Sequence, residues 1–206
     1  MSNGKGQNFV GASPERLLCI SKNQLITDAL AGSAPRGKTP IEDAAYADTL
    51  LNSDKERHEH NLVIDFISQS LSQLGLLPQI LSPRLKQLSN IQHLWTPITA
   101  IVPPNIHPLK IVAQLHPTPA VAGTLPDIAC SEIQRYESFE RGLYAAPLGW
   151  LDGEGNCEFI VSIRSALIDG DRARLYAGAG IVEGSDPDRE FAEIQLKLQA
   201  LLKALI

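Results

Sequence analysis

Cysteine and positive charge are both scarce in this chain of 206 residues. The three cysteines, Cys19, Cys130 and Cys157, lie far apart, so the sequence predicts neither a disulfide framework nor a cysteine-based metal site. Lysine and arginine together number 18 against 23 aspartates and glutamates, and the net charge of -5 offers no basic surface for nucleic acid or anionic lipid. We therefore expect no nucleic-acid partner and a reduced, cytoplasmic location.

Long apolar runs are absent as well. No stretch approaches the roughly 20 apolar residues that span a membrane, and the N-terminal residues contain no apolar core of signal-peptide length. Hydrophobic residues nevertheless make up 44% of the chain, which is enough for a substantial core. We expect one domain over residues 1–206 and no membrane partner.

The N-terminal third predicts a β-hairpin followed by a long helix. Apolar residues dominate 16–20 ("RLLCI") and 24–31 ("QLITDALA"), and the polar "SKN" between them fits a short hairpin turn. Ser53 followed by Glu56 has the spacing of a capping box, the reciprocal bonding of side chain and backbone that begins many helices. The helical pattern continues until Gly75, where we expect the helix to end.

The rest of the chain mixes strands and helices without the alternation typical of a parallel sheet. Residues 91–102 predict a strand, in which Pro97 indicates an edge position or a bend because proline cannot donate a hydrogen bond. Helices are expected at 109–115 and from Pro187 onward. Three strands in a meander are expected between these helices, at 142–152, 157–168 and 173–182. The fold class that follows is α+β.

The stretch "GSAPRGKT", Gly32–Thr39, matches the phosphate-loop pattern G-x-x-x-x-G-K-[ST]. That loop requires a buried parallel strand before it and a helix N-terminus facing the phosphates. Here a hairpin strand precedes it, Pro40 follows it directly, and the next segment is too polar for the central helix of a nucleotide-binding fold. The best candidate for a magnesium-binding aspartate, Asp65, falls within a predicted helix on its solvated side. We therefore expect no nucleotide.

Two predicted helices carry Glu-x-x-Glu, and this spacing places each pair of carboxylates on one helical face. The pairs are Glu56 with Glu59 and Glu190 with Glu193. The first face continues into apolar residues, and the second lies beside an apolar stripe of Phe191, Ile194, Leu198 and Leu201. Carboxylates about 4 Å apart repel by roughly 4 kcal/mol near a protein interior, so a divalent cation between them, typically Mg²⁺, would explain the position. Ordinary exposed glutamates are the alternative.

A second group of residues is cationic and polar. Arg164 lies in a segment that is otherwise apolar, so it requires an anionic partner, either a bound carboxylate or one of the glutamates. The backbone of "GAG" could present N–H groups to an anion, or could be a site of tight packing. The group comprises His93, Tyr144, Arg164, Gly178, Gly180 and Lys197.

Eight motifs, in order along the chain, resemble those of the chorismate-utilising enzymes, which include isochorismate, salicylate, anthranilate and aminodeoxychorismate synthases. They are "GASPERL", "LAGSAPRG", "DKERHEH", "QHL", "LHPTPAVAG", "RGLYAAPLGW", "IRSA" and "AGAGIVEGSDPDREFAEIQLK". The resemblance covers nearly the whole chain and implies the C-terminal portion of the family's α+β fold, a largely antiparallel sheet with packed helices. "GSAPRG" then matches the family's substrate loop through Gly32 and Ser33, and its ligand would be chorismate.

The resemblance also implies roles for individual residues. Glu59 and Glu193 would ligate Mg²⁺ directly, Glu56 and Glu190 would assist through water, and the ion would hold the ring carboxylate of chorismate. Glu15, in "SPE", matches the general acid that protonates the departing C4 hydroxyl. The enolpyruvyl carboxylate would be held by Tyr144, Arg164 and the backbone of Gly178 and Gly180, with Lys197 beside the metal-bound carboxylate and His93 near the substrate side chain.

The wording of "LHPTPAVAG" resembles the isochorismate synthase branch, because the amine-using and salicylate-forming branches tend to carry threonine at the position of Ala120. The implied reaction is the isomerisation of chorismate to isochorismate, in which water attacks the ring with loss of the C4 hydroxyl. Menaquinone or phylloquinone, salicylate or siderophore biosynthesis would use such a product.

The largest departure from the family pattern is an absent upstream half, which carries strands of the sheet and a lysine that acts as general base. Lys5 and Lys22, expected in an unstructured start and a hairpin turn, are poorly placed to replace it. Smaller departures are Ser33 for threonine, Asp28 for glutamate and "GTLP" for "GTPR". Three interpretations stay open: a truncated synthase domain impaired by itself, a non-catalytic half that binds chorismate and Mg²⁺ and pairs with an upstream-half polypeptide, and a degenerate fragment.

Overall fold

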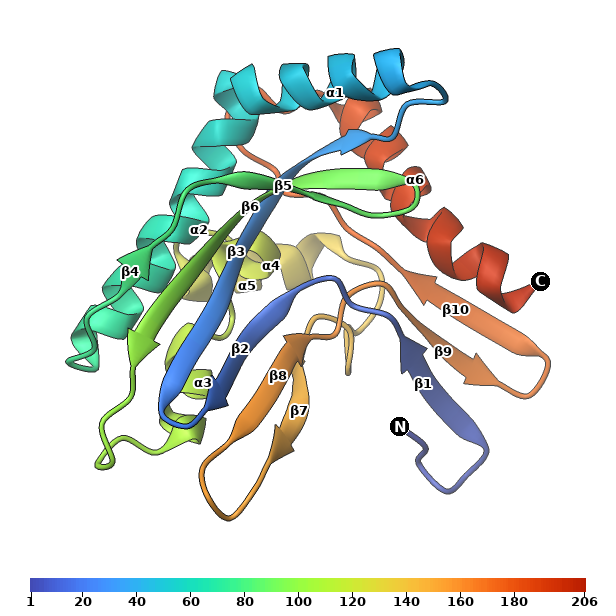
Figure 1. The fold of residues 1–206 in the computed structure, drawn as a ribbon. Coiled ribbons are helices and arrows are strands. Elements are labelled where there is room, and N and C mark those ends of the chain that lie inside the picture. Colours follow the sequence, from blue (N-terminus) through green and yellow to red (C-terminus); the bar gives the residue numbers. More distant parts are fainter.

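Two antiparallel β-sheets and six helices make up the fold, in a computed structural model that describes residues 1–206 (Figure 1). The larger sheet has the strand order β4-β6-β3-β2-β8-β7, with β5 also paired to β6, and the smaller sheet has the order β1-β9-β10. The longest helix lies against one face of the larger sheet, and the last helix lies beside the smaller sheet. The α+β class expected from the sequence is confirmed.

The expected hairpin is formed by β2 (Arg16–Ser21) and β3 (Gln24–Pro35). Its turn consists of Lys22 and Asn23 with φ of 50° and 63°, the left-handed pair that matches the twist of a two-residue hairpin. β3 continues to Pro35, so the first four residues of the phosphate-loop match are part of a strand. A register shift between Ala31 and Ser33 places a bulge at this end of the strand.

β6 (Ile91–Ile101) runs antiparallel to β3 along its whole length and is also paired on its other side, so the expectation of an edge strand at Pro97 is wrong. On its other side β6 pairs with two short strands, β5 (Arg84–Gln87) and β4 (Gln79–Ile80), which leave a gap between them. The Pro97 carbonyl accepts a hydrogen bond from Leu81 on that side. Since N–H and C=O of one strand residue point the same way, the missing donor faces the gap, and the ladder to β3 is intact.

Two helices follow β3: α1 (Pro40–Asn52) and α2 (Asp54–Gln73). The Ser53 side chain accepts a hydrogen bond from the backbone N–H of Glu56, as the capping pattern predicts, and Gly75 with φ of 78° follows the end of α2. The fourfold spacing of Val63, Ile67 and Leu71 places all three on the face that packs into the core, where each is at most 1% exposed. Burying each of these side chains contributes about 2 kcal/mol.

Three shorter helices cover the same side of the larger sheet: α3 (Pro108–Leu115), α4 (Pro119–Ala122) and α5 (Pro126–Tyr136). Ile111 and Leu115 of α3 are fully buried in the core, as the predicted short helix requires.

The expected three-strand meander is wrong, because residues 157–168 belong to two sheets. β7 (Pro147–Leu151) and β8 (Cys157–Val161) extend the larger sheet. The chain then leaves that sheet at Ser162–Arg164, where Arg164 has φ of 51°. It then enters the smaller sheet, which consists of β1 (Gln7–Gly11), β9 (Ser165–Asp169) and β10 (Arg172–Tyr176).

The expectation of an unstructured N-terminus is wrong too, since β1 pairs with β9 along five residues. The partners are more than 150 positions apart in sequence, and local patterns carry no signal for such a pairing. Tyr144 lies in a turn before β7, and "AGAG" lies in a loop after β10, although the sequence predicted strands in both places.

The last helix, α6 (Pro187–Leu205), begins at Asp186, whose side chain accepts a hydrogen bond from the backbone N–H of Arg189. The helix is as predicted, but its orientation is unexpected: Glu190 is 4% exposed and Phe191 is 61% exposed. None of the helices combines the length and the apolar character that crossing a membrane requires.

Candidate active site

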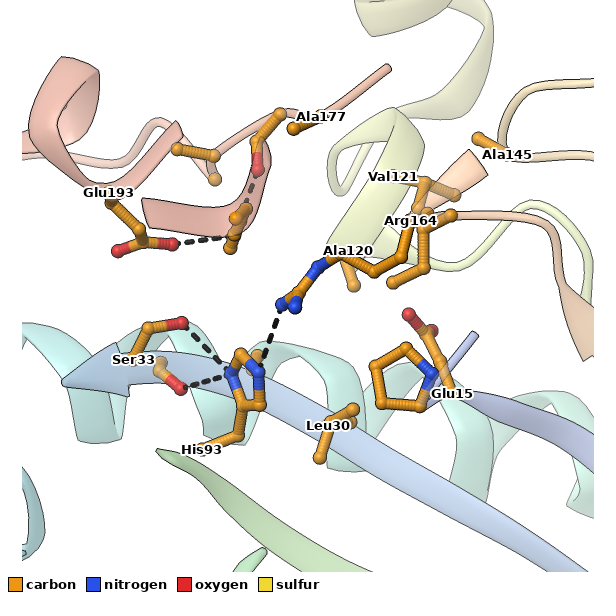
Figure 2. Close-up of a pocket in the computed structure, with 18 of the residues that line it drawn as sticks. Glu15, Leu30, Ser33, His93, Ala120, Val121, Ala145, Arg164, Ala177 and Glu193 are labelled. Atoms are coloured by element: carbon orange, nitrogen blue, oxygen red, sulfur yellow. Dashed lines mark hydrogen bonds and ion pairs between the residues drawn. The ribbon is translucent and has the colours of Figure 1, made fainter. Parts of the chain in front are cut away.

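Residues from nine separated segments converge on a single cavity between the ends of β3 and β6, the loop after β10 and α6 (Figure 2). The cavity brings together twelve of the residues singled out in the sequence. They are Glu15, Gly32, Ser33, Glu59, His93, Ala120, Tyr144, Arg164, Gly178, Gly180, Glu193 and Lys197. The other two, Glu56 and Glu190, lie outside the lining.

Glu15 stands on a turn that connects β1 with β2, and its carboxyl group points into the cavity toward Arg164 (Figure 2). The side chain of Ser13 donates a hydrogen bond of 2.5 Å to the carbonyl of Val161, and Val161 N–H donates to the carbonyl of Glu15 at 3.1 Å. Glu15 is only 4% exposed. Burial raises the pKa of its carboxyl group to about 7, with Asp28 adding to the increase and Lys197 opposing it. A carboxyl group in this position can hold a proton near neutral pH.

Arg164 and His93 form the floor of the cavity (Figure 2). The Arg164 guanidinium is buried and donates through Nη2 to Nε2 of His93 at 3.1 Å, and it forms no ion pair with any glutamate. Burial, assisted by the charges of Arg164 and Lys197, lowers the pKa of His93 to about 3, so the ring is neutral. Because Nε2 accepts from Arg164, the ring hydrogen is on Nδ1, which faces Ser33 Oγ at 2.9 Å.

Tyr144 and the loop after β10 form the opposite wall. The Tyr144 ring stacks on Tyr176 with 5.3 Å between the centroids. The backbone N–H groups of Gly178 and Gly180 donate no hydrogen bond within the chain. A Cβ atom on Gly178 would lie 2.9 Å from the Tyr144 hydroxyl, and one on Gly180 would clash with the carboxylate of Glu59. Only glycine therefore permits this close approach of the loop to the two side chains.

Glu59 of α2 and Glu193 of α6 face one another across the cavity rim. Burial and the charges of Glu56 and Glu193 raise the pKa of Glu59 to about 7. Glu193 pairs with Lys197, whose Nζ lies 2.6 Å from Glu193 Oε1 and donates to the carbonyl of Gly178 at 2.8 Å. Glu59 thus carries a partly buried carboxylate whose nearest charged neighbours include two others of the same sign.

Glu56 and Glu190 lie behind this pair and are almost fully buried. Glu56 accepts hydrogen bonds from the backbone N–H of Ser33 and from Arg189, both at 3.0 Å. Lys55 lies 2.5 Å from Glu190 and 3.4 Å from Glu56. These ion pairs keep the four carboxylates from converging, and no group of three or more acidic, histidine or cysteine side chains is arranged around a common metal position.

The charge of this region nevertheless suits a bound cation. Four carboxylates meet three cationic side chains, Lys55, Arg189 and Lys197, so one negative charge is unbalanced. The pKa of Glu59 is raised mainly by burial, and the charges of Glu56 and Glu193 add to the increase. Carboxylate oxygens are the donors that Mg²⁺ uses in proteins. The donor set therefore fits Mg²⁺ in chemistry, and binding would require Lys197 or Lys55 to release a carboxylate.

The remainder of the phosphate-loop match has its backbone donors occupied. Gly37 N–H donates to the carboxylate of Asp43 at 2.8 Å, and Lys38 N–H donates to Glu42 at 2.9 Å. Arg36 also pairs with Asp43 at 2.7 Å. Carboxylates of α1 thus take the place that phosphates would need, and only the Gly32–Ser33 end of the match reaches the cavity.

Sequence reasoning missed a functional candidate in Arg141, which also lines the cavity. Arg141 forms two hydrogen bonds with the Glu137 carboxylate and donates to the carbonyl of Val121 at 2.8 Å, while its guanidinium lies over the Tyr144 ring at 5.7 Å. Arg141 therefore connects two parts of the cavity wall: the segment that contains Ala120 and Val121, and the ring of Tyr144. The "RGLYA" motif was the available signal, but it does not predict the contacts of its arginine with Val121 and with the Tyr144 ring.

The chain matches a family profile described as "Chorismate binding enzyme" over residues 1–206. It is 46% identical over 198 residues to the salicylate biosynthesis isochorismate synthase of Pseudomonas aeruginosa, which covers 96% of this chain and 42% of that protein. The structure of a putative 2,3-dihydroxybenzoate-specific isochorismate synthase, DhbC from Bacillus anthracis, is similar with a TM-score of 0.94 and 38% identity, covering 100% of this chain and 56% of that one. For MenF, the menaquinone-specific isochorismate synthase from Escherichia coli, the TM-score is 0.87 at 38% identity, over 98% and 46% of the respective chains. The chain spans about half the length of the curated relatives it matches.

Proposed function

We propose that this chain, which belongs to the family of chorismate-binding enzymes, carries the substrate site of an isochorismate synthase and converts chorismate to isochorismate together with residues outside these 206. One observation carries the proposal. A buried carboxyl group, an arginine without a carboxylate partner and a cluster of excess carboxylates all face one cavity, at Glu15, Arg164 and Glu59. Chorismate has two carboxylates and a C4 hydroxyl, and each would meet one of these groups.

The enolpyruvyl carboxylate would bind on the side of Arg164. The guanidinium is desolvated and has only the neutral His93 as a partner, so an incoming carboxylate would supply its missing counter-charge. The free N–H groups of Gly178 and Gly180 and the hydroxyl of Tyr144 stand beside it as further donors. This arrangement supports carboxylate recognition from two directions.

The ring carboxylate would bind on the side of α2 and α6 with Mg²⁺. We assign Glu59 and Glu193 as direct ligands and Glu56 and Glu190 as supporting carboxylates, because the first two line the cavity and the others lie behind them. When bound, the ion supplies positive charge that offsets the repulsion between the substrate and these glutamates. Lys197, already beside Glu193, would add a second positive charge to the same region.

Glu15 would act as general acid. Its proton would pass to the C4 oxygen, which leaves as water, while a second water adds at the other ring position and gives up a proton to a base. A pKa near 7 keeps enough of the acid protonated near neutral pH for this step. The neutral His93, anchored between Ser33 and Arg164, would orient the substrate side chain and donate no proton there.

We propose that the base lies outside these residues, in a longer form of the chain or in a second polypeptide. Lys197 is the one lysine in the cavity lining, and its pairing with Glu193 directs it away from a water-activating role. Lys5 and Lys22 do not reach the cavity. The relatives, about twice as long, contain sequence in which such a group could lie.

Calorimetry of chorismate binding to the purified chain, with and without Mg²⁺, tests the site directly. We expect binding that depends on Mg²⁺ and that is lost in Glu193→Ala. Glu132→Ala is the matched control, because Glu132 lies exposed on α5 and pairs only with Arg135. A folded chain that binds no chorismate in the presence of Mg²⁺ would contradict the proposal and favour a degenerate fragment.

A second measurement separates the catalytic interpretation from a non-catalytic binding half. The upstream segment of a full-length relative is expressed separately and added to the chain, and isochorismate formation is followed. We expect turnover with the added segment and at least tenfold less without it, since a missing base affects the chemical step more than binding. Binding without turnover in the reconstituted mixture would leave only the binding role.

A further inference from the structure

A pair of opposite charges lies directly behind the Glu15 turn, outside the lining of the cavity. Lys86, on β5, donates a hydrogen bond of 2.5 Å from Nζ to the carbonyl oxygen of Pro14, the residue before Glu15. The same ammonium lies 3.5 Å from Oδ2 of Asp28, whose side chain is 2% exposed. Lys86 thus connects an edge strand of the larger sheet to the peptide that carries the proposed acid.

The path of Lys86 follows from strand pairing. Lys86 is directly opposite His93 in the β5–β6 register, so their side chains share the face of the sheet on which the cavity lies. Lys86 extends along this face past the Trp95 ring, with Nζ 5.7 Å from the ring centroid, to reach the Glu15 turn. The turn is bonded to β8 through Ser13 and Val161 on its other side. Lys86 therefore holds the Glu15 turn from one side, and the hydrogen bonds with Val161 of β8 hold it from the other.

Asp28 has few other partners. Its Oδ1 makes no hydrogen bond, and the nearest other cation, Arg16 Nη1, is 4.0 Å away. An almost fully buried carboxylate requires a close counter-charge, because transfer from water costs several kcal/mol when it is unpaired. Lys86 provides that charge, and Asp28 in turn holds the ammonium beside Pro14.

Four charged side chains, each from a different part of the fold, face Glu15. Asp28 on β3 raises its pKa, while Lys86 on β5, Lys197 on α6 and Arg164 after β8 lower it, in addition to the dominant effect of burial. Lys86 and Asp28 thus oppose one another at Glu15.

We propose that Lys86, held by Asp28, is a positioning residue for Glu15: it fixes the Ser13–Glu15 turn so that the carboxyl group faces the cavity, and it balances the charge of Asp28 behind that group. The inference rests on the proposed function in so far as Glu15 is the proton donor. Lys86 itself touches no substrate position, since it does not line the cavity.

Carboxyl ¹³C NMR titration of Glu15 in the whole chain, without substrate or metal, tests this inference independently of activity. The Glu15 signal is identified by its loss in Glu15→Gln. Lys86→Met removes the balancing cation and should raise the pKa of Glu15 by about one unit, whereas Asp28→Asn should lower it by a similar amount. A general loosening of the structure would shift the Glu15 pKa in the same direction in both variants. Opposite shifts would therefore exclude that explanation.

Arg84→Met is the matched control. Arg84 lies on the same strand and its guanidinium is 5.0 Å from the same Trp95 ring, but it contacts neither Pro14 nor Asp28. We expect no shift of the Glu15 pKa in Arg84→Met and recovery of the wild-type value in Lys86→Arg. If Lys86→Met does not fold, Lys86→Gln replaces it: this side chain can still donate a hydrogen bond but carries no charge, so it should also raise the Glu15 pKa.

Kinetic and binding measurements separate this inference from the proposed function. With the upstream segment added, Lys86→Met should reduce kcat about tenfold and leave KM within about threefold, as expected when an acid is misplaced but the binding groups are intact. An unchanged Glu15 titration in folded Lys86→Met, or shifts of equal sign in Lys86→Met and Asp28→Asn, would overturn the inference. Absence of chorismate binding by the wild-type chain would instead overturn the proposed function and leave the titration result valid.

Discussion

The two faces of the β3–β6 pair have opposite chemistry. On the face toward α2, Leu25, Ala29 and Ile98 are completely buried and join the hydrophobic core. On the other face, the same two strands carry Asp28 and His93, which are buried among other polar and charged groups. Neighbouring residues of one strand thus serve packing and chemistry in alternation.

This difference explains how stability and function are divided. The apolar face accepts polar residues only where they find a hydrogen-bond partner, as Thr27 and Thr96 do, whereas the charged face requires particular partners at particular distances. The charged groups around the cavity are costly to bury, since burial moves the pKa values of Glu15, Glu59 and Arg164 toward the neutral form.

Adjacent residues on β3 provide the largest expected contrast. Leu25→Ala should lower the free energy of unfolding by about 2–5 kcal/mol, because Leu25 is completely buried against α2. Ile26→Ala, one residue along and 38% exposed on the other face, should cost about 1 kcal/mol or less. Urea unfolding of both variants measures the contrast, and equal losses would show that the two faces do not differ in packing.

The charged face should make stability depend on pH. The pKa of Glu15 is about 7 in the folded chain, against 4.5 for an unperturbed glutamate, so its contribution to stability is fully present below about pH 4.5 and is lost as pH rises through about 7. Unfolding free energies of wild type and Glu15→Gln, measured from pH 4 to 8, should therefore diverge by about 3 kcal/mol in favour of the variant at the upper end. A constant difference across this range would contradict the buried acid.

A substitution at Gly180 tests the contact between the loop before α6 and Glu59 of α2. Gly180→Ala puts a methyl group against the Glu59 carboxylate and should weaken Mg²⁺-dependent chorismate binding about tenfold, or 1.4 kcal/mol. Gly153→Ala is the control, since a Cβ atom there meets nothing within 4 Å. Calorimetry of both variants gives the comparison. Unaltered binding by Gly180→Ala would remove Glu59 from the proposed site.

The smallest expected effect concerns the start of α2, the helix that covers the apolar face. Ser53→Ala removes the hydrogen bond to the Glu56 N–H and should reduce stability by about 1 kcal/mol. Ser72→Ala, an exposed position near the end of the same helix, should change stability by less than 0.5 kcal/mol. Thermal unfolding distinguishes the two, and a loss in Ser72→Ala as large as that in Ser53→Ala would rule out a capping contribution.

Local patterns predicted the elements that depend on neighbours in sequence. The β2–β3 hairpin, the Ser53 cap of α2, α3 and the last helix all occur where the sequence indicates. Patterns failed where partners are distant: Pro97 lies inside the sheet because its missing donor faces a gap, and residues 157–168 divide between two sheets at Arg164. Glu-x-x-Glu spacing and the isolated Arg164 pointed to part of the cavity lining, and the family resemblance added Glu15 and Ala120.

The orientation of α6 is another feature that local sequence patterns did not predict. Its pattern predicts an amphipathic helix but cannot tell which stripe will be covered, and the structure buries Glu190 while leaving Phe191 exposed. Ion pairs with Lys55 and Lys197, from α2 and from α6 itself, hold the carboxylate side inward. Lys86 was overlooked for a related reason, since its contact with Pro14 spans 72 positions.

The sequence by itself determined the fold class, the helices with their caps, the hairpin and, through its motifs, the family and the candidate site residues. Only the tertiary structure decided which stripe of α6 turns inward, which carboxylates line the cavity, and that Lys86 stands behind Glu15. The physical reason is the range of the forces involved. Caps, turns and amphipathic periodicity act over a few residues, whereas burial, ion pairing and pKa shifts depend on groups that only the folded chain brings together.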